Sequence, residues 1–206
     1  MLLFGTQSTR QHSISMFTDS LVDRHGQDIP ISELCRLLNT VCLPMAGNRI
    51  SELVQKQAEL NFGHEEVMIE FELCISAIFK PFLHYLKRLA TSPKDLITVW
   101  MTILSVMTQL LSTEVDRGGM IPANLLTASK QLATEHLRNA IMILMSKGIL
   151  LPEVGNGDDV SSLTWTAIEN ISYVKQFITE WKESGTVNAE ETVNAEATVD
   201  AEAPEI

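Results

Sequence analysis

The amino-acid sequence predicts an all-α protein built from antiparallel helix pairs. Apolar residues recur at spacings of three and four along several segments, which is the period of a helix with one buried face. No segment keeps the alternation of apolar and polar residues that a half-buried strand requires. Pro, Gly and Ser residues divide the chain into segments of helix length. Such pairs stack either as an α-solenoid or as a compact bundle, and both arrangements remain open at this stage.

Composition divides the chain into two parts. The protein has 206 residues, 45% of them hydrophobic, so it can bury a substantial core. We expect a helical-repeat domain over residues 1–183, with disorder in the first dozen residues left open. Residues 184–206 contain no Lys or Arg, and residues 186–203 form three tandem hexads, TVNAEE, TVNAEA and TVDAEA. This stretch has too little apolar surface to offset its ordering entropy, so we predict a disordered acidic tail.

The charge balance excludes several classes of partner. The net charge is −11, and six of the acidic residues lie in the tail. The remainder carries fifteen basic and twenty acidic residues with no basic cluster, which argues against nucleic acid as a partner. There is no polybasic patch for anionic lipid, no run approaching about 20 apolar residues, and no secretory leader in Met1–Phe4. We expect a cytoplasmic protein without a transmembrane segment.

The first third of the chain predicts short helices. Ser13–Arg24 has apolar residues on one side and stops near Gly26. A second helix begins near Pro30, and Pro44 and Gly47 are expected to end it. Its inner stripe comprises Ile31, Leu34, Cys35, Leu38 and Cys42. Residues 49–60 form a weaker candidate, and we expect much of that stretch to be loose.

The middle of the chain contains the strongest helix signals. Glu65–Leu89 is the longest candidate, with a kink expected at Pro81. The next helix begins with Ser92 as cap and Pro93 as first residue. It is apolar most of the way round, which is typical of a core helix enclosed by others. Its stripe comprises Leu96, Trp100, Ile103, Leu104, Met107, Leu110 and Leu111.

Two further helices follow a charged, Gly-containing loop over residues 112–122. The first resumes between Ala123 and Thr134 and ends at Gly148, a typical C-terminal residue. Its buried line comprises Leu132, Leu137, Ala140, Ile141 and Leu144. The last helix is capped by Ser161 or Ser162. Its apolar line comprises Ala167, Ile171, Val174, Ile178 and Trp181.

The sequence contains none of the phosphate-binding, dinucleotide-binding, zinc-protease or serine-hydrolase motifs. A metal site at His64–Glu66, or a pair of acids at Asp19 and Asp23, is less expected than a solvated helix face. The remaining candidates are expected to lie in the core or at the surface without a chemical role. They are His84, Glu135, His136 and the methionines Met101, Met107, Met142 and Met145. We predict no catalytic, cofactor-binding or metal-binding residue, no cofactor, and no enzymatic activity of this chain.

Three cysteines, Cys35, Cys42 and Cys74, lie in apolar surroundings. Their odd number and the lack of CxxC spacing favour free thiols in a helical core over a metal or redox site. This pattern is typical of a protein from a reducing compartment.

Three blocks are more specific than a generic helical pattern. They are AIFKPFLHYLKRLATSPKDLITVWMTILSVM (Ala77–Met107), HLRNAIMILMSKGILLP (His136–Pro152) and SLTWTAIENI (Ser162–Ile171). Their order and spacing resemble the last helical homology domain of the large Golgi Arf guanine-nucleotide exchange factors, the brefeldin-A-resistance-factor and GNOM-type proteins. The family's paired Trp pattern is similar to Ser162–Trp165, although its first Trp is absent here.

The resemblance covers most of residues 10–180 and implies a HEAT- or armadillo-like helical region downstream of a Sec7 domain. In this family the Sec7 domain catalyses exchange, and nothing in this chain resembles it. The resemblance therefore implies a non-catalytic regulatory or interaction module in Golgi vesicle transport. Its expected partners are Arf-pathway or Golgi proteins, or other domains of the same exchange factor, with peripheral association with Golgi membranes left open. An unrelated α-solenoid adaptor is the alternative.

Overall fold

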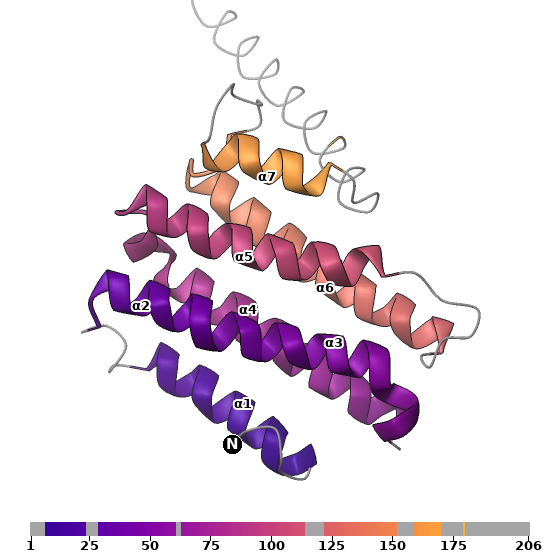
Figure 1. Cartoon of the computed structure of the whole chain (residues 1–206). Coiled ribbons are helices and arrows are strands. Elements are labelled where there is room, and N and C mark those ends of the chain that lie inside the picture. Colours follow the sequence, from indigo (N-terminus) through magenta and orange to yellow (C-terminus); the bar gives the residue numbers. More distant parts are fainter. Residues whose placement is uncertain are drawn as a thin grey trace, which may run out of the picture.

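The computed structural model describes residues 7–23, 29–60, 63–113, 122–151, 159–169 and 179. Within these ranges the secondary structure is helical and contains no strand, which confirms the all-α prediction (Figure 1). The elements are α1 (Gln7–Val22), α2 (Ile31–Leu37), the π-helical turn η2 (Leu38–Cys42), α3 (Leu43–Leu60), α4 (His64–Leu89), α5 (Pro93–Ser112), α6 (Ala123–Ser146) and α7 (Val160–Ile168).

The helices form two layers, and successive helices alternate between them. One layer contains α1, α4 and α6, and the other contains α3, α5 and α7. Between the layers, α4 packs on α3 and α5, and α5 packs on α6. Within the layers, α1 packs on α4, α4 on α6, α3 on α5, and α5 on α7. Figure 1 shows the same order as a stack from α1 to α7. Among the described helices, α1 has no extensive contact with α6 or α7, so the array is an open solenoid.

The α2–η2–α3 rod differs from the prediction that Pro44 and Gly47 end a helix. Residues 31–60 are continuously helical, and the π-helical turn η2 lies within this rod just before Pro44. The Leu43 amide donates to the Leu38 carbonyl, five residues back. Pro44 therefore lies inside the continuous rod, just after the π-helical turn, and does not end the helix. Gly47 lies at a close approach to α5, since a Cβ there would come within 3.2 Å of Val106 Cγ2.

Other boundaries also shift. Helix α1 begins at Gln7, six residues before the expected start. Residues 49–60, expected to be loose, belong to α3, and Ile50 and Leu53 are buried. Helix α7 is capped by Asp159, two residues before Ser161 and three before Ser162, because the Asp159 carboxylate accepts a 2.8 Å hydrogen bond from the Ser162 amide. Its described part ends at Ile168, and Ile171, Val174, Ile178, Trp181 and the tail lie outside the described residues.

Helices α4 and α5 match their predicted positions closely. Helix α4 continues through Pro81, which is itself buried. Helix α5 begins at Pro93, and the Ser92 hydroxyl donates to the Asp95 carboxylate at 2.6 Å, so it does not cap a backbone amide. Helix α6 ends as predicted, since Gly148 adopts a positive φ of 66°.

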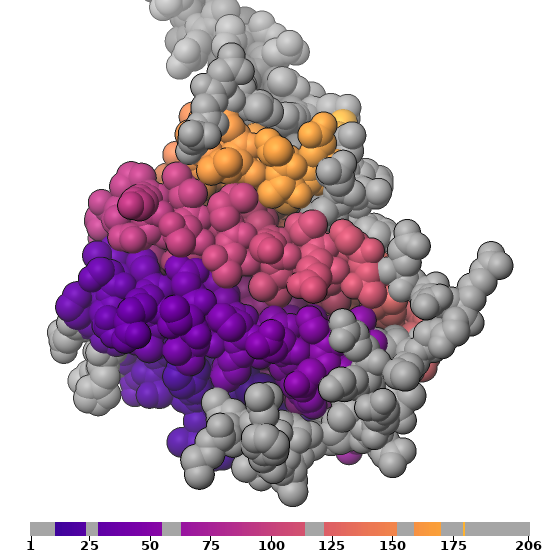
Figure 2. All heavy atoms as spheres, viewed as in Figure 1, coloured from indigo at the N-terminus to yellow at the C-terminus, as the bar shows by residue number. Residues whose placement is uncertain are grey.

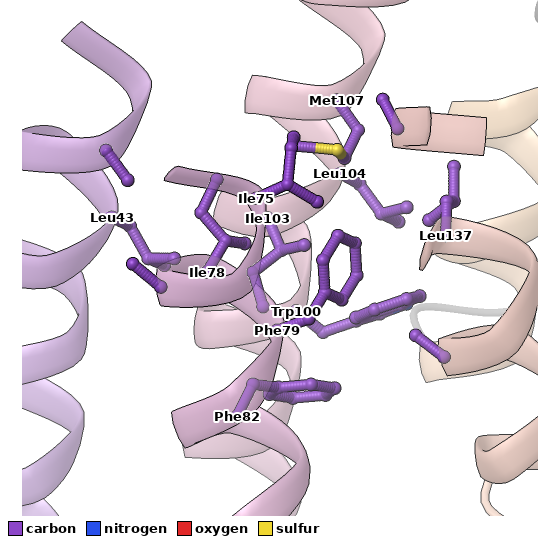
Figure 3. Packing of buried hydrophobic residues seen from close by; sticks show 14 of the residues in the cluster. Leu43, Ile75, Ile78, Phe79, Phe82, Trp100, Ile103, Leu104, Met107 and Leu137 are labelled. Carbon is purple, nitrogen blue, oxygen red and sulfur yellow. The ribbon is translucent and has the colours of Figure 1, made fainter. Parts of the chain in front are cut away.

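Trp100 of α5 is among the largest fully buried side chains, and Figure 3 shows it in the core with Phe79 and Phe82 of α4. Its ring stacks on Phe82 with centroids 5.3 Å apart, and its indole N–H donates to the Thr164 hydroxyl at 2.8 Å. Phe79 of α4 stacks on His136 of α6. The three blocks that carry the family resemblance therefore contact one another, the first meeting the second through Phe79 and the third through Trp100.

Candidate interaction surfaces

The residues considered for chemistry do not converge. Within the described ranges, no group of three or more His, Cys, Asp or Glu side chains is placed to hold a metal ion. His64, Glu65 and Glu66 are exposed at the first turn of α4, and the Glu66 carboxylate accepts a 3.0 Å hydrogen bond from the Gly63 amide. The Glu66 carboxylate therefore caps the N-terminal end of α4.

Asp19 lies at an exposed junction between α1 and α4. Lys80 Nζ is 2.6 Å from Asp19 Oδ1, and this hydrogen-bonded cation is the main cause that lowers the pKa of the Asp19 carboxyl. The Ser15 hydroxyl donates to the same carboxylate at 3.2 Å. Asp23 lies exposed just beyond α1. The two acids are thus not a paired site, because Asp19 joins two helices of one layer.

The other titratable candidates have packing roles. His84 is exposed and meets the edge of the Tyr85 ring at a centroid distance of 4.7 Å. His136 is half-buried against Phe79, with ring centroids 5.9 Å apart. Glu135 accepts from the Gln131 side chain on the same face of α6.

All three thiols are free and buried. Desolvation raises the pKa of Cys42 and of Cys74 to about 12, and raises that of Cys35 as well. A thiol of this kind stays protonated at neutral pH and is a poor nucleophile and metal ligand. Of the methionines, Met107 is fully buried, Met101 and Met145 are half-buried, and Met142 is exposed.

A buried ion pair between α3 and α4 was missed by the sequence reasoning. Arg49 Nε donates to Glu70 Oε1 at 2.6 Å, and both side chains are almost completely buried, at 6% and 0% exposed. Arg49 Nη1 also reaches Glu52 Oε2 at 2.7 Å. Arg49 and Glu52 are one helical turn apart, and this spacing was the only local sign of an ion pair at Arg49. The pair joins the two layers in the first part of the solenoid, so its role is structural.

The outer face of α5 carries no charge after Asp95. Its exposed and half-buried positions after Asp95 are Ile97, Thr98, Met101, Thr102, Ser105, Val106, Thr108, Gln109 and Ser112. The hydroxyls of Thr98 and Thr102 donate to carbonyls one turn back, at 2.8 Å each, which satisfies them within the helix. In Figure 2 this helix forms a band of the visible surface between α3 and α7. A face without charged residues suits protein contact.

Among the described helices, α5 alone is long and apolar enough to cross a membrane by length and composition, which the sequence reasoning did not recognise. Its apolar residues pack against both layers of the array, and Val99, Trp100 and Ile103 have no exposed surface. Burial in the protein core therefore accounts for the composition of this helix.

A groove of about 420 Å³ runs along α6, and the described residues that line it all belong to this helix. They are Leu126, Thr127, Lys130, Gln131, Thr134, Glu135 and Arg138. The spacing of Thr127, Gln131, Thr134 and Arg138 places them on one face of the helix. Ser129 and His136 point the other way, toward Met68 and Phe79 of α4. The groove is thus on the side of α6 that faces away from α4.

The fold and these surfaces define a helical-repeat protein whose described residues carry packing and contact surfaces. A family model described as "GBF1-like, tetratrico peptide repeat region" matches residues 3–173. The chain belongs to this family. No curated protein matches the sequence, and no solved structure matches it. The family membership confirms the resemblance to the helical region of a GBF1-type Arf exchange factor, and its description names tetratricopeptide repeats, another kind of stacked helix pair.

Proposed function

We propose that this chain is a non-catalytic regulatory or interaction module of a Sec7-type Arf guanine-nucleotide exchange factor that acts in Golgi vesicle transport. The observation that carries the proposal is the extent of the family match, which spans residues 3–173 and therefore reaches from α1 to α7. The related feature is the whole solenoid and not a single motif. Membership of this family favours the proposal over the alternative of an unrelated adaptor.

The architecture supports a contact role. Stacked helix pairs present extended surfaces, and proteins of this kind bind other proteins along them. The described residues offer an uncharged α5 face and an α6 groove, whereas the titratable residues serve helix ends, ion pairs and ring contacts. The partners we propose are Arf-pathway or Golgi proteins, or other domains of the same exchange factor. We also propose a cytoplasmic location with peripheral association with Golgi membranes.

Two measurements test this proposal. A nucleotide-release assay with purified Arf should show no acceleration by the purified chain, and an acceleration would overturn the non-catalytic assignment. Proximity labelling in cells should recover Golgi or Arf-pathway proteins with the tagged chain, with an unrelated helical-repeat protein as control. Labelling of the same proteins by both would favour the unrelated adaptor. An in-frame Sec7-like sequence in the genomic DNA upstream of Met1 would support the assignment independently.

A further inference from the structure

The exposed side of α4 lies between its contacts with α1 and α6. A line of charged and apolar side chains runs along this side, from the first turn of the helix to the last, and we call it the α4 stripe. Its members recur around Ser76 at spacings of three and four residues, which places them on one face of the helix. They are Glu65, Ile69, Glu72, Lys80, Leu83 and Lys87. All six are exposed except Leu83, which is half-buried, as is Ser76.

The charges of the α4 stripe are reversed about its midpoint, Ser76. Glu72 lies four residues before Ser76, and Lys80 lies four residues after it. Glu65 lies eleven residues before Ser76, and Lys87 lies eleven residues after it. An antiparallel copy of the same stripe would therefore place each acid opposite a base.

The apolar members of the stripe follow the same symmetry. Ile69 and Leu83 lie seven residues on either side of Ser76. Ile69 is 44% exposed, and an antiparallel copy would cover it with Leu83. The small side chain of Ser76 at the midpoint lets two helices approach closely. A surface that matches its own reversed copy is what a two-fold symmetric dimer requires.

Interactions within one chain do not account for this charge pattern. The helix dipole acts on the first and last turns, so it explains Glu65 and Lys87 but not Glu72 and Lys80. Glu72 and Lys80 are about 12 Å apart along the helix axis, which is too far for an ion pair within α4. Glu65, Glu72 and Lys87 make no hydrogen bond or ion pair within the described part of the chain. Lys80 pairs with Asp19 of α1 and is still 51% exposed.

The surface is large enough for a reversible dimer. The stripe is about 33 Å long, and helices packed 8–10 Å apart make α1, α4 and α6 a band about 20 Å wide. Contact over this band covers about 650 Å² per copy, somewhat less than the ~800 Å² of a standard interface. Since the chain has a net charge of −11, two copies repel each other on average, and matched charges are needed at the contact.

We propose that two copies of this chain form a two-fold symmetric dimer through the α4 stripe, with the two α4 helices antiparallel and Ser76 beside the symmetry axis. Glu72 of each copy faces Lys80 of the other, and Glu65 faces Lys87. Ile69 packs against Leu83 between these charged pairs. Two-fold symmetry makes each contact occur twice. The uncharged face of α5 belongs to the other layer and stays available for a different partner.

Sedimentation velocity of the full chain tests this contact. Between about 5 and 500 μM the unchanged chain should pass from monomer to dimer, as an interface below the standard size predicts. Glu72→Lys creates two Lys–Lys contacts in the dimer, and Lys80→Glu creates two Glu–Glu contacts. Each variant alone should dimerise at least about tenfold more weakly than the unchanged chain, because like charges oppose each other.

An equimolar mixture of the two variants should dimerise as strongly as the unchanged chain. In the mixed dimer, the lysine introduced at position 72 meets the glutamate introduced at position 80, and native Lys80 meets native Glu72. A general loss of folding cannot produce this recovery. Where Lys80→Glu lowers the melting temperature through loss of its Asp19 contact, Glu65→Lys and Lys87→Glu provide the same exchange at the outer positions.

A matched variant on the other layer controls for net charge. Ser105→Lys/Gln109→Lys changes the net charge as much as Glu72→Lys does, but on the exposed face of α5, and should leave the dimer unchanged. A chain that stays monomeric at about 500 μM would overturn the proposal, since a dimer of this size should form there. A mixture that dimerises no better than its separate components would also overturn it. A dimer that only the α5 variant weakens would place the contact on α5 instead.

Discussion

The indole N–H of Trp100 in α5 donates to the hydroxyl of Thr164 in α7 at 2.8 Å, although the two residues are 64 positions apart. Both side chains are completely buried. Thr164 in turn donates to the Val160 carbonyl within its own helix. Trp100 also stacks on the ring of Phe82 in α4, so this residue joins three helices of the solenoid. A buried indole needs such a partner for its N–H.

Substitution of Trp100 should therefore destabilise the whole array. Trp100→Ala should reduce the free energy of unfolding by about 3–5 kcal/mol, the range for truncating a large buried aromatic. Thr164→Val preserves shape but removes the acceptor. The indole N–H left without a partner should then reduce the free energy of unfolding by about 1–3 kcal/mol. Thermal or urea unfolding followed by circular dichroism measures both effects.

A double substitution controls for packing. Trp100→Phe removes the N–H donor, so adding Thr164→Val to it should cost less than Thr164→Val costs in the native background. Equal costs in both backgrounds would show that the hydrogen bond contributes nothing beyond shape.

The sequence was most informative where the signal is local. The start of α5 follows from Pro93, and the end of α6 follows from the left-handed preference of Gly148. The burial of Trp100 follows from the apolar character of its helix on nearly all sides. These features depend on residues within one or two turns, so a single sequence is enough to predict them.

The predictions failed where distant residues or unusual backbone decide the outcome. Pro44 ends no helix, because a π-helical turn directly precedes it and the helical rod continues through it. No prediction singled out Arg49, and only its partner Glu70, 21 positions away, explains its burial. The α6 groove and the Trp100–Thr164 bond likewise join residues through the stacking of helices, which periodicity does not specify.

Breaking the Arg49–Glu70 pair should be costly because it leaves a buried charge without its counterion. Arg49→Met should reduce the free energy of unfolding by about 3–5 kcal/mol. The double variant Arg49→Met/Glu70→Leu should recover most of this loss, since two apolar side chains need no counterion. Urea unfolding of the single and double variants measures both values.

The exposed pair of Arg36 and Glu33 provides the control for this prediction. Arg36→Met should leave the melting temperature unchanged within error, because exposed ion pairs contribute little. A double variant as unstable as Arg49→Met alone would contradict the assignment and would indicate that the two helices pack poorly without the charges.

Gly148 should be sensitive to substitution through its backbone alone. A Cβ at this position would meet no atom within 4 Å, yet its φ of 66° lies in the left-handed region. Gly148→Ala should therefore cost about 1–2 kcal/mol. Gly148→Asn should cost less, since Asn tolerates this conformation, and equal losses for both variants would point to a side-chain clash. Chemical denaturation distinguishes these outcomes.

Asp159 should make the stability of α7 depend on pH. Its carboxylate accepts hydrogen bonds from the Ser162 amide at 2.8 Å and from the Ser162 hydroxyl at 3.1 Å, and the amide bond is the main cause that lowers its pKa. A carboxyl whose pKa is lower in the folded state stabilises the fold above its unfolded pKa, about 3.9. That stabilisation is lost as the pH falls through the folded value.

Asp159→Asn isolates this effect, because Asn also caps a helix but does not titrate. Melting temperatures are measured between pH 2 and 7. The native chain should melt at a higher temperature than Asp159→Asn at neutral pH, and this difference should disappear below about pH 4. Other carboxyls with lowered pKa values, such as Asp19, act equally in both proteins and cancel in the difference. A gap that stays constant across this range would show that the Asp159 charge does not stabilise α7.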